Sequence, residues 1–146
     1  AYVENSALKS SYMQNRLINN THERARKADS ALMGLGNMNE NSFMVQLGWF
    51  TSQEIITARQ DEGVVGDIAG YAFLDIQGRP VDTVMNDRVI GLSLDQLRKI
   101  PYVIAIASEN TKATAILAAL RSGIVDVIAT SASNARTVLS LISAKH

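Results

Sequence analysis

Apolar runs and polar segments follow one another in a clear order in the segment 100–141. Tyr102 to Ala107 is a short apolar, β-branched run, typical of a buried parallel strand. A polar loop, Ser108 to Lys112, precedes residues at helical spacing, and Gly123 marks the end of that helix. Val125 to Ala129 is a second apolar run. A strand, loop, helix and strand in this order form a βαβ unit, which implies a parallel sheet covered by helices on both faces.

The remaining elements are expected from capping signals and apolar runs. Either Ser131 or Ser133 can cap a last helix. Capping boxes at residues 51–54 and 93–96 predict helices to about Asp61 and Lys99. The other expected elements are a helix over 7–18 broken at 19–21, a charged helix over 22–28, strands over 30–36 and 71–75, a turn over 75–80 and a returning segment over 81–86.

Composition indicates one globular domain and excludes several classes of function. The chain has 146 residues, 47% of them hydrophobic, and equal numbers of basic and acidic residues, 14 each. Nucleic-acid binding through phosphates is therefore not expected of this segment. There is no cysteine, and the two histidines, His22 and His146, are not clustered with carboxylates, so we expect no metal site and no cofactor. No apolar run approaches a bilayer span and no signal peptide is visible, so we expect a soluble cytoplasmic protein.

Two stretches carry candidate binding chemistry. Lys112 opens a helix, where a cation opposes the helix dipole unless an anion is bound, and the alternative is a solvated lysine on a surface turn. Asp67 stands among three glycines and apolar neighbours, where its carboxylate can accept bonds from sugar hydroxyls; alternatively it caps its own loop. Gly34 and Gly36 form a Gly-x-Gly turn that permits close backbone approach, which alone is weak evidence for a ligand. Residues 43–50 hold the single tryptophan and are interpreted as core or subunit interface.

Four segments in order carry a family resemblance: ADSALMGLG (28–36), EGVVGDIAGYAFLDIQGRPV (62–81), RVIGLSLDQLRKIP (88–101) and ENTKATAILAALRSGIVDVIAT (109–130). This order resembles the effector-binding domain of the SorC family of bacterial transcriptional regulators of sugar metabolism. The match covers nearly all of residues 1–146 but only the C-terminal part of that domain. The family's N-terminal helix-turn-helix DNA reader and the first half of its effector domain are not in this segment. A chain that begins with Ala1 is consistent with a fragment.

The resemblance implies a three-layer α/β/α sandwich with a mainly parallel sheet, similar to the sugar-phosphate isomerase and deaminase group. It implies a sugar or sugar-phosphate effector, a homodimer or homotetramer, operator DNA bound through the separate N-terminal domain, and no membrane partner. Asp67 would bind sugar hydroxyls, and Lys112 would bind the phosphate or polar end. The resulting set of expected ligand-binding residues is Asp67, Lys112, Gly34, Gly36, Gly66, Glu109 and Asn110.

Two departures from the family pattern leave the ligand open. Ala107-Ser108 stands where the family usually has glycines, and Thr130-Ser131 where it often has Thr-Asp. A different ligand, or one without phosphate, is therefore possible. Three functions compete: a sugar sensor, which we favour and which is not an enzyme; an isomerase or deaminase with Asp67 as general base; and an oligomerisation module.

Overall fold

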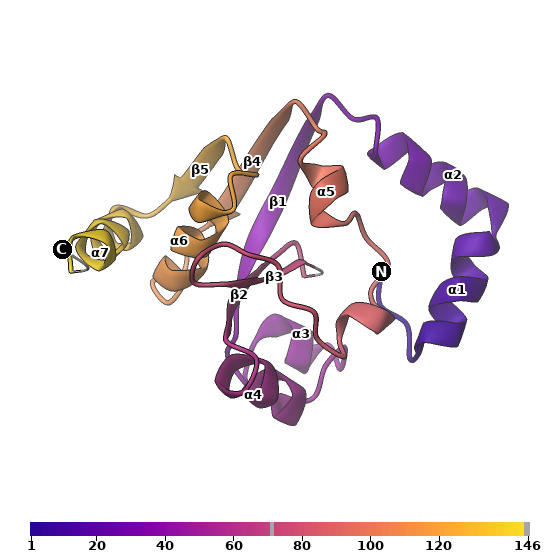
Figure 1. Cartoon of the computed structure of the whole chain (residues 1–146), viewed down its shortest axis with the longest axis horizontal. Coiled ribbons are helices and arrows are strands. Elements are labelled where there is room, and N and C mark those ends of the chain that lie inside the picture. Colours follow the sequence, from indigo (N-terminus) through magenta and orange to yellow (C-terminus); the bar gives the residue numbers. More distant parts are fainter. Residues whose placement is uncertain (71, 145–146) are drawn as a thin grey trace.

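The computed structural model describes residues 1–70 and 72–144 and contains a single mixed sheet between helices (Figure 1). The helices are α1 (Ser6–Gln14), α2 (Arg16–Ala25), α3 (Phe43–Gln46), α4 (Ser52–Gln60), the 3-10 helix η1 (Asn86–Arg88), α5 (Leu94–Leu97), α6 (Ala113–Arg121) and α7 (Ala132–Ser143). The strands are β1 (Ser30–Asn37), β2 (Val64–Ile68), β3 (Ala72–Asp75), β4 (Tyr102–Ala107) and β5 (Val127–Thr130).

The sheet has the order β3-β2-β1-β4-β5 and is parallel at its core. β1 pairs in parallel with β4, and β4 pairs in parallel with β5, with Leu32 opposite Ile104 and Ile104 opposite Val127. β2 and β3 form an antiparallel hairpin, and β2 reaches β1 over Leu35 to Asn37. The predicted α/β class and the βαβ unit are confirmed. The antiparallel hairpin makes the sheet more mixed than we expected.

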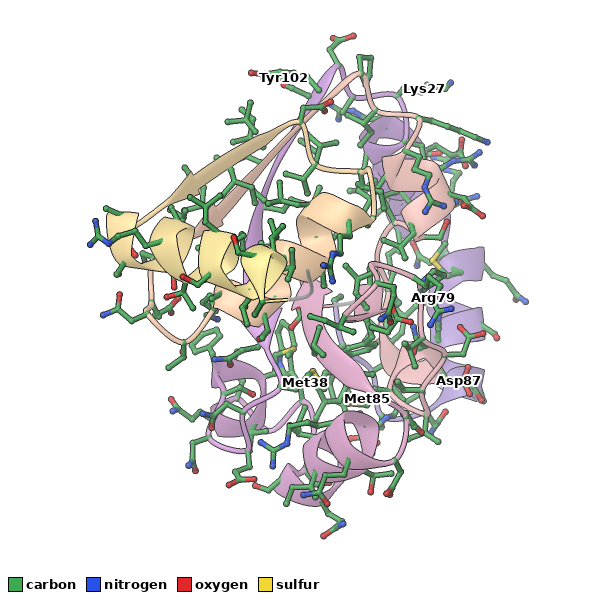
Figure 2. The ribbon with its side chains drawn as sticks, turned by 60° about the vertical axis from the view of Figure 1, so that its left-hand side comes forward. Lys27, Met38, Arg79, Met85, Asp87 and Tyr102 are labelled. Carbon is green, nitrogen blue, oxygen red and sulfur yellow. The ribbon has the colours of Figure 1, made fainter. Side chains whose placement is uncertain are left out.

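Two apolar cores lie on opposite faces of the sheet. The larger core joins β1 and β4 to α6 through residues such as Met33, Val103 and Ile116. The second core joins the hairpin to α3 and α4 on the other face and includes Met38 and Met85, which Figure 2 labels. The three-layer sandwich is therefore complete at the hairpin. Parallel strands are usually covered on both faces, and this second helical layer does not extend over β4 and β5.

Most of the predicted helix boundaries are confirmed. Both capping boxes form, at the starts of α4 and α5. Ser131, and not Ser133, caps α7 by accepting a bond from the backbone of Asn134. Gly123, with φ of +67°, follows α6 as the pattern predicted.

The prediction for the first two helices was wrong. The break falls at Asn15, and residues 19–21 lie inside α2, which ends at Ala25. Asn15 Oδ1 accepts a bond of 3.0 Å from the backbone N–H of Leu17, so it caps α2 directly after ending α1. The returning segment over 81–86 is not a strand either, although the 75–80 turn forms and Pro80 bridges to Leu74. Tyr71, the first residue of a predicted strand, and His146 lie outside the described residues.

None of the helices in the described part of the chain is long and apolar enough to cross a membrane. Within the same residues, no group of three or more His, Cys, Asp and Glu side chains could hold a metal ion.

Candidate functional site

A cavity of about 720 Å³ lies at the carboxyl end of β1, between the hairpin, α3 and the start of α6. It is lined by five of the seven residues expected to bind ligand: Gly34, Gly36, Asp67, Glu109 and Lys112. In open α/β sheets, ligands bind in the crevice outside the carboxyl ends of the strands, so the cavity lies where the fold favours a site.

Asp67 is the most unusual side chain in this cavity. It is 3% exposed, and its Oδ1 accepts a bond of 2.6 Å from the backbone N–H of Gly70. Its Oδ2 is buried and has no hydrogen-bond partner among the described residues. Burial raises the pKa of Asp67 to about 6, against the lowering effects of the Gly70 bond, of the charge on Lys112 and of the nearby backbone N–H of Gly36. An acceptor left unpaired in a buried position costs about 1–3 kcal/mol, more when it is charged, unless a ligand satisfies it.

Gly36 leaves the space that Asp67 occupies. The two residues are opposite each other in the antiparallel β1–β2 pair. A Cβ atom on Gly36 would lie 1.8 Å from Asp67 Oδ2, which is well inside contact distance. A Cβ on Gly34, two residues earlier on the same strand, would meet nothing within 4 Å. Gly36 is therefore needed to make room for the Asp67 carboxylate, whereas Gly34 leaves open space beside the cavity.

Lys112 brings a positive charge to the same place. Its side chain is 14% exposed, and its Nζ donates a bond of 3.0 Å to the carbonyl oxygen of Leu35. The Nζ also lies 3.7 Å from Glu109, whose side chain is 66% exposed, so that ion pair adds little. The lysine is therefore not a solvated surface residue. It is held beside β1, where its charge stabilises the ionised form of Asp67.

The other two expected residues, Gly66 and Asn110, do not line the cavity. A Cβ on Gly66 would lie 2.4 Å from the Cβ of Ala115, so this glycine permits close packing of β2 on α6. Asn110 Oδ1 accepts a bond of 2.7 Å from Ser133 and joins the loop to α7.

The two departures from the family pattern are likewise outside the cavity lining. Thr130 Oγ1 donates a bond of 2.5 Å to the carbonyl oxygen of Ala107, and Ser131 caps α7. These residues therefore join β4, β5 and α7, and in this structure they do not shape the ligand space directly.

Sequence reasoning missed the amide-rich wall of the cavity. This wall comes from the polar loop after β1 and from the residues that follow it: Asn37, Asn39, Asn41, Ser42, Phe43, Gln46 and Trp49. Asn37 Nδ2 donates a bond of 2.9 Å to Thr111 and so connects β1 to the lysine loop, while Ser42 Oγ is buried with no partner in the described part of the chain. The polar side chains within residues 37–42 were the available signal in the sequence.

The cavity as a whole suits a neutral ligand with many hydroxyl groups. Amides and hydroxyls both donate and accept hydrogen bonds, Asp67 offers an acceptor, and aromatic and apolar side chains lie beside them. Its charged lining residues are two carboxylates, Asp67 and Glu109, and one cation, Lys112. One cation can hold one anionic group at most, and here it already contacts a carbonyl oxygen.

Comparison with known proteins connects this geometry to a family. Residues 1–140 match the family described as "Putative sugar-binding domain". The transcriptional regulator LsrR of Enterobacter sp. (strain 638) is 34% identical over 121 residues, which cover 80% of this chain and 36% of that protein. The chain thus spans little more than a third of this curated relative.

Two solved structures have the same fold. A sugar-binding domain of a transcriptional repressor from Vibrio fischeri has a TM-score of 0.88 and 49% identity, over 98% of this chain and 56% of that one. The full-length sorbitol operon regulator SorC from Klebsiella pneumoniae has a TM-score of 0.85 and 27% identity, over 95% of this chain and 44% of that one. This chain therefore belongs to the sugar-binding domain family of SorC-type transcriptional regulators.

Proposed function

We propose that this chain is the effector-binding part of a bacterial regulator that controls a carbohydrate-utilisation operon. Its ligand is a sugar or sugar phosphate, bound in the cavity at the carboxyl end of β1. Ligand binding shifts the equilibrium between two states of a homodimer or homotetramer, and a separate helix-turn-helix domain then binds its operator more or less tightly. The relatives named as transcriptional regulators support this role, and a cytoplasmic location follows from it.

The unpaired Oδ2 of Asp67 is the observation that carries the proposal. A buried acceptor without a partner is costly, and a sugar hydroxyl entering the cavity would donate the missing bond. The cost of keeping Asp67 is then explained by binding and not by folding. Such a stability cost is common at functional sites.

The second part of the site is Lys112, together with the amide wall. Lys112 would hold the polar end of the sugar, or a phosphate if the ligand has one. Its Nζ would then donate to the ligand in place of the Leu35 carbonyl oxygen. Glu109 lies at the exposed side of that lysine and competes with a phosphate for its charge. On this chain's residues alone, a sugar without phosphate is favoured over a phosphorylated one.

An isomerase or deaminase is the second candidate function. The raised pKa of Asp67, about 6, suits a general base. Against this role, Glu109 is the other carboxylate in the lining, and it is exposed and paired with Lys112, so the cavity lacks a buried second carboxylate among its described residues. Turnover of a sugar phosphate would distinguish an enzyme from a sensor.

A thermal-shift screen against sugars and their phosphates, sorbose and sorbose 1-phosphate included, tests the proposal. A ligand at 100 times its dissociation constant stabilises the native state by about 2.7 kcal/mol. We expect one sugar to raise the melting temperature of the unaltered chain, and Asp67→Ala and Lys112→Ala each to abolish that shift. Leu139→Ala on α7 serves as the control, since this leucine is 64% exposed and lies outside the cavity lining. An equal shift in the unaltered chain and both alanine variants would refute the site.

A further inference from the structure

Two aromatic side chains line the candidate ligand cavity: Trp49, the single tryptophan of the chain, and Phe43. Core residues were expected in this segment, and Met44 and Phe50 are buried in the second core. Trp49 is only partly buried against that core, and Phe43 is 70% exposed. Large aromatic surfaces beside a cavity gain free energy when a ligand covers them, so the amide-rich wall offers an apolar surface as well as hydrogen-bonding groups.

Other side chains hold the indole ring of Trp49 in place. Tyr2, which is not in the cavity lining, stacks on it in parallel, with ring centroids 6.3 Å apart and ring planes inclined by 6°. Arg88 donates a bond of 3.0 Å to the hydroxyl of Tyr2, and its guanidinium carbon lies 5.5 Å from the centre of the tyrosine ring. Arg88 also pairs with Glu54 at the start of α4. The indole is therefore oriented before a ligand arrives, and such preorganisation reduces the entropy lost on binding.

The indole ring lies beside the turn that carries Asp67. A Cβ atom on Gly70 would lie 3.7 Å from Cζ3 of Trp49, and the backbone N–H of the same glycine donates the bond of 2.6 Å to Asp67 Oδ1. Ala69, which precedes Gly70, has a φ of +57°, which is uncommon for a residue with a side chain and is typical of functional sites. The turn therefore brings a hydroxyl acceptor close to an aromatic surface in one cavity.

The C–H groups of a sugar ring complement an aromatic surface beside a hydroxyl acceptor. A cyclic sugar has hydroxyl groups around its rim and C–H groups that form an apolar patch on one face of the ring. The C–H hydrogens carry a small positive charge and the face of an aromatic ring a negative one, so the two attract each other. An open-chain sugar alcohol has the same kinds of hydroxyl groups, but its rotating chain presents no fixed apolar face. Amides and carboxylates alone would bind both forms through their hydroxyl groups.

We propose that Trp49 binds the C–H face of a cyclic sugar while Asp67 accepts a hydrogen bond from a hydroxyl group at the rim of the same ring. The site then selects cyclic sugars over open-chain sugar alcohols. This inference rests on the proposed function and adds to it the form of the sugar that the cavity binds. Trp49 determines this specificity, and Phe43 adds apolar surface to the same wall.

Fluorescence titration of the unaltered chain tests the inference. The probes are D-glucose with D-glucitol, D-mannose with D-mannitol, D-galactose with galactitol, and L-sorbose with L-iditol, each free and as a terminal phosphate. Since the chain has one tryptophan, its emission reports on Trp49 alone. We expect at least one cyclic sugar to shift that emission and to protect Trp49 from quenching by acrylamide. Its alditol should bind at least about tenfold more weakly, the size of one lost aromatic contact.

Substitution of Trp49 separates an aromatic contact from simple filling of the core. Trp49→Leu keeps an apolar side chain and should weaken binding of the cyclic sugar at least about tenfold in calorimetry, so that the preference over the alditol disappears. Trp49→Phe keeps an aromatic face and should retain the preference. Tyr102→Leu on β4 removes an aromatic ring that is 47% exposed and outside the cavity lining, and it should change either affinity by less than about twofold.

An alditol that binds as tightly as its cyclic sugar would overturn the inference, and if Asp67→Ala abolishes that binding, the proposed function still stands. A cyclic sugar that binds without changing the emission of Trp49, or with the same affinity in Trp49→Leu, would also overturn it. Absence of binding by every probe would overturn both the inference and the proposed function. If the Trp49 variants do not fold, the emission and quenching results on the unaltered chain decide.

Discussion

Replacement of Asp67 by asparagine should stabilise the protein at neutral pH. Burial raises the pKa of Asp67 from its ordinary value of 3.8 to about 6, so the native state holds a proton that the unfolded chain has lost between these two pH values. Each pKa unit corresponds to about 1.4 kcal/mol, which gives a cost of about 3 kcal/mol once Asp67 is ionised in the native state. Asparagine has nearly the same shape and does not titrate.

The sign of the pH dependence follows from the direction of this shift. Asp67 favours the native state fully below its unfolded pKa of 3.8, and this contribution is lost as the pH rises through about 6. We therefore expect Asp67→Asn and the unaltered chain to have similar free energies of unfolding near pH 4. The variant should gain as the pH rises and be more stable by up to about 3 kcal/mol above pH 7.

Urea unfolding at a series of pH values measures this difference. The single tryptophan, Trp49, stacks on Tyr2 and provides a fluorescence signal. Asp75→Asn is the matched control. Partial burial raises the pKa of Asp75, but the bonds from the backbone and side chain of Arg79 lower it by more, so the net pKa lies below its ordinary value. Asp75→Asn should therefore become less stable relative to the unaltered chain as the pH rises. A constant difference between Asp67→Asn and the unaltered chain from pH 4 to 8 would refute the reasoning.

Three further substitutions test other parts of the site. Gly36→Ala would place a methyl group on the Asp67 carboxylate and should destabilise the chain by roughly 1–3 kcal/mol in urea unfolding, whereas Gly34→Ala should change stability by less than about 1 kcal/mol; equal effects would contradict the close approach. Lys112→Gln removes the charge that lowers the pKa of Asp67, so a carbon-13 NMR titration should show that pKa above 6. An unchanged pKa would show that the charge on Lys112 does not act on Asp67. Gly66→Ala should also lower the free energy of unfolding by roughly 1–3 kcal/mol, because the methyl group would push α6 away. An unchanged free energy of unfolding would show that α6 can move without loss of stability.

Local signals in the sequence predicted most helices and strands, but not α3 or β2, the strand that carries Asp67. Capping boxes depend on residues three positions apart, and short apolar runs such as 102–107 give a strand wherever a core is available, so both were readable without the fold. The break between α1 and α2 was misplaced because three polar residues at 19–21 seemed a stronger interruption than Asn15. A single asparagine that caps the next helix proved decisive.

The candidate site was only partly predictable. Family resemblance selected Asp67 and Lys112, and the structure brings them to one cavity. Gly66 was expected beside the ligand, yet its missing side chain serves contact with α6, because a glycine looks the same in sequence whether a ligand or a helix approaches it. The amide-rich wall over 37–49 was missed because its side chains converge only through the path of the chain after β1.

Proton release on sugar binding tests the central claim most directly. If a sugar hydroxyl donates to Asp67, binding stabilises the carboxylate and lowers its pKa, so near pH 6 the chain should release up to about half a proton per sugar bound. Calorimetry with the sugar found by the thermal-shift screen, in two buffers of different ionisation enthalpy, measures this number. The account predicts proton release from the unaltered chain and none from Asp67→Asn. Equal proton release from both proteins, or binding with no release from either, would contradict a sugar bound at Asp67.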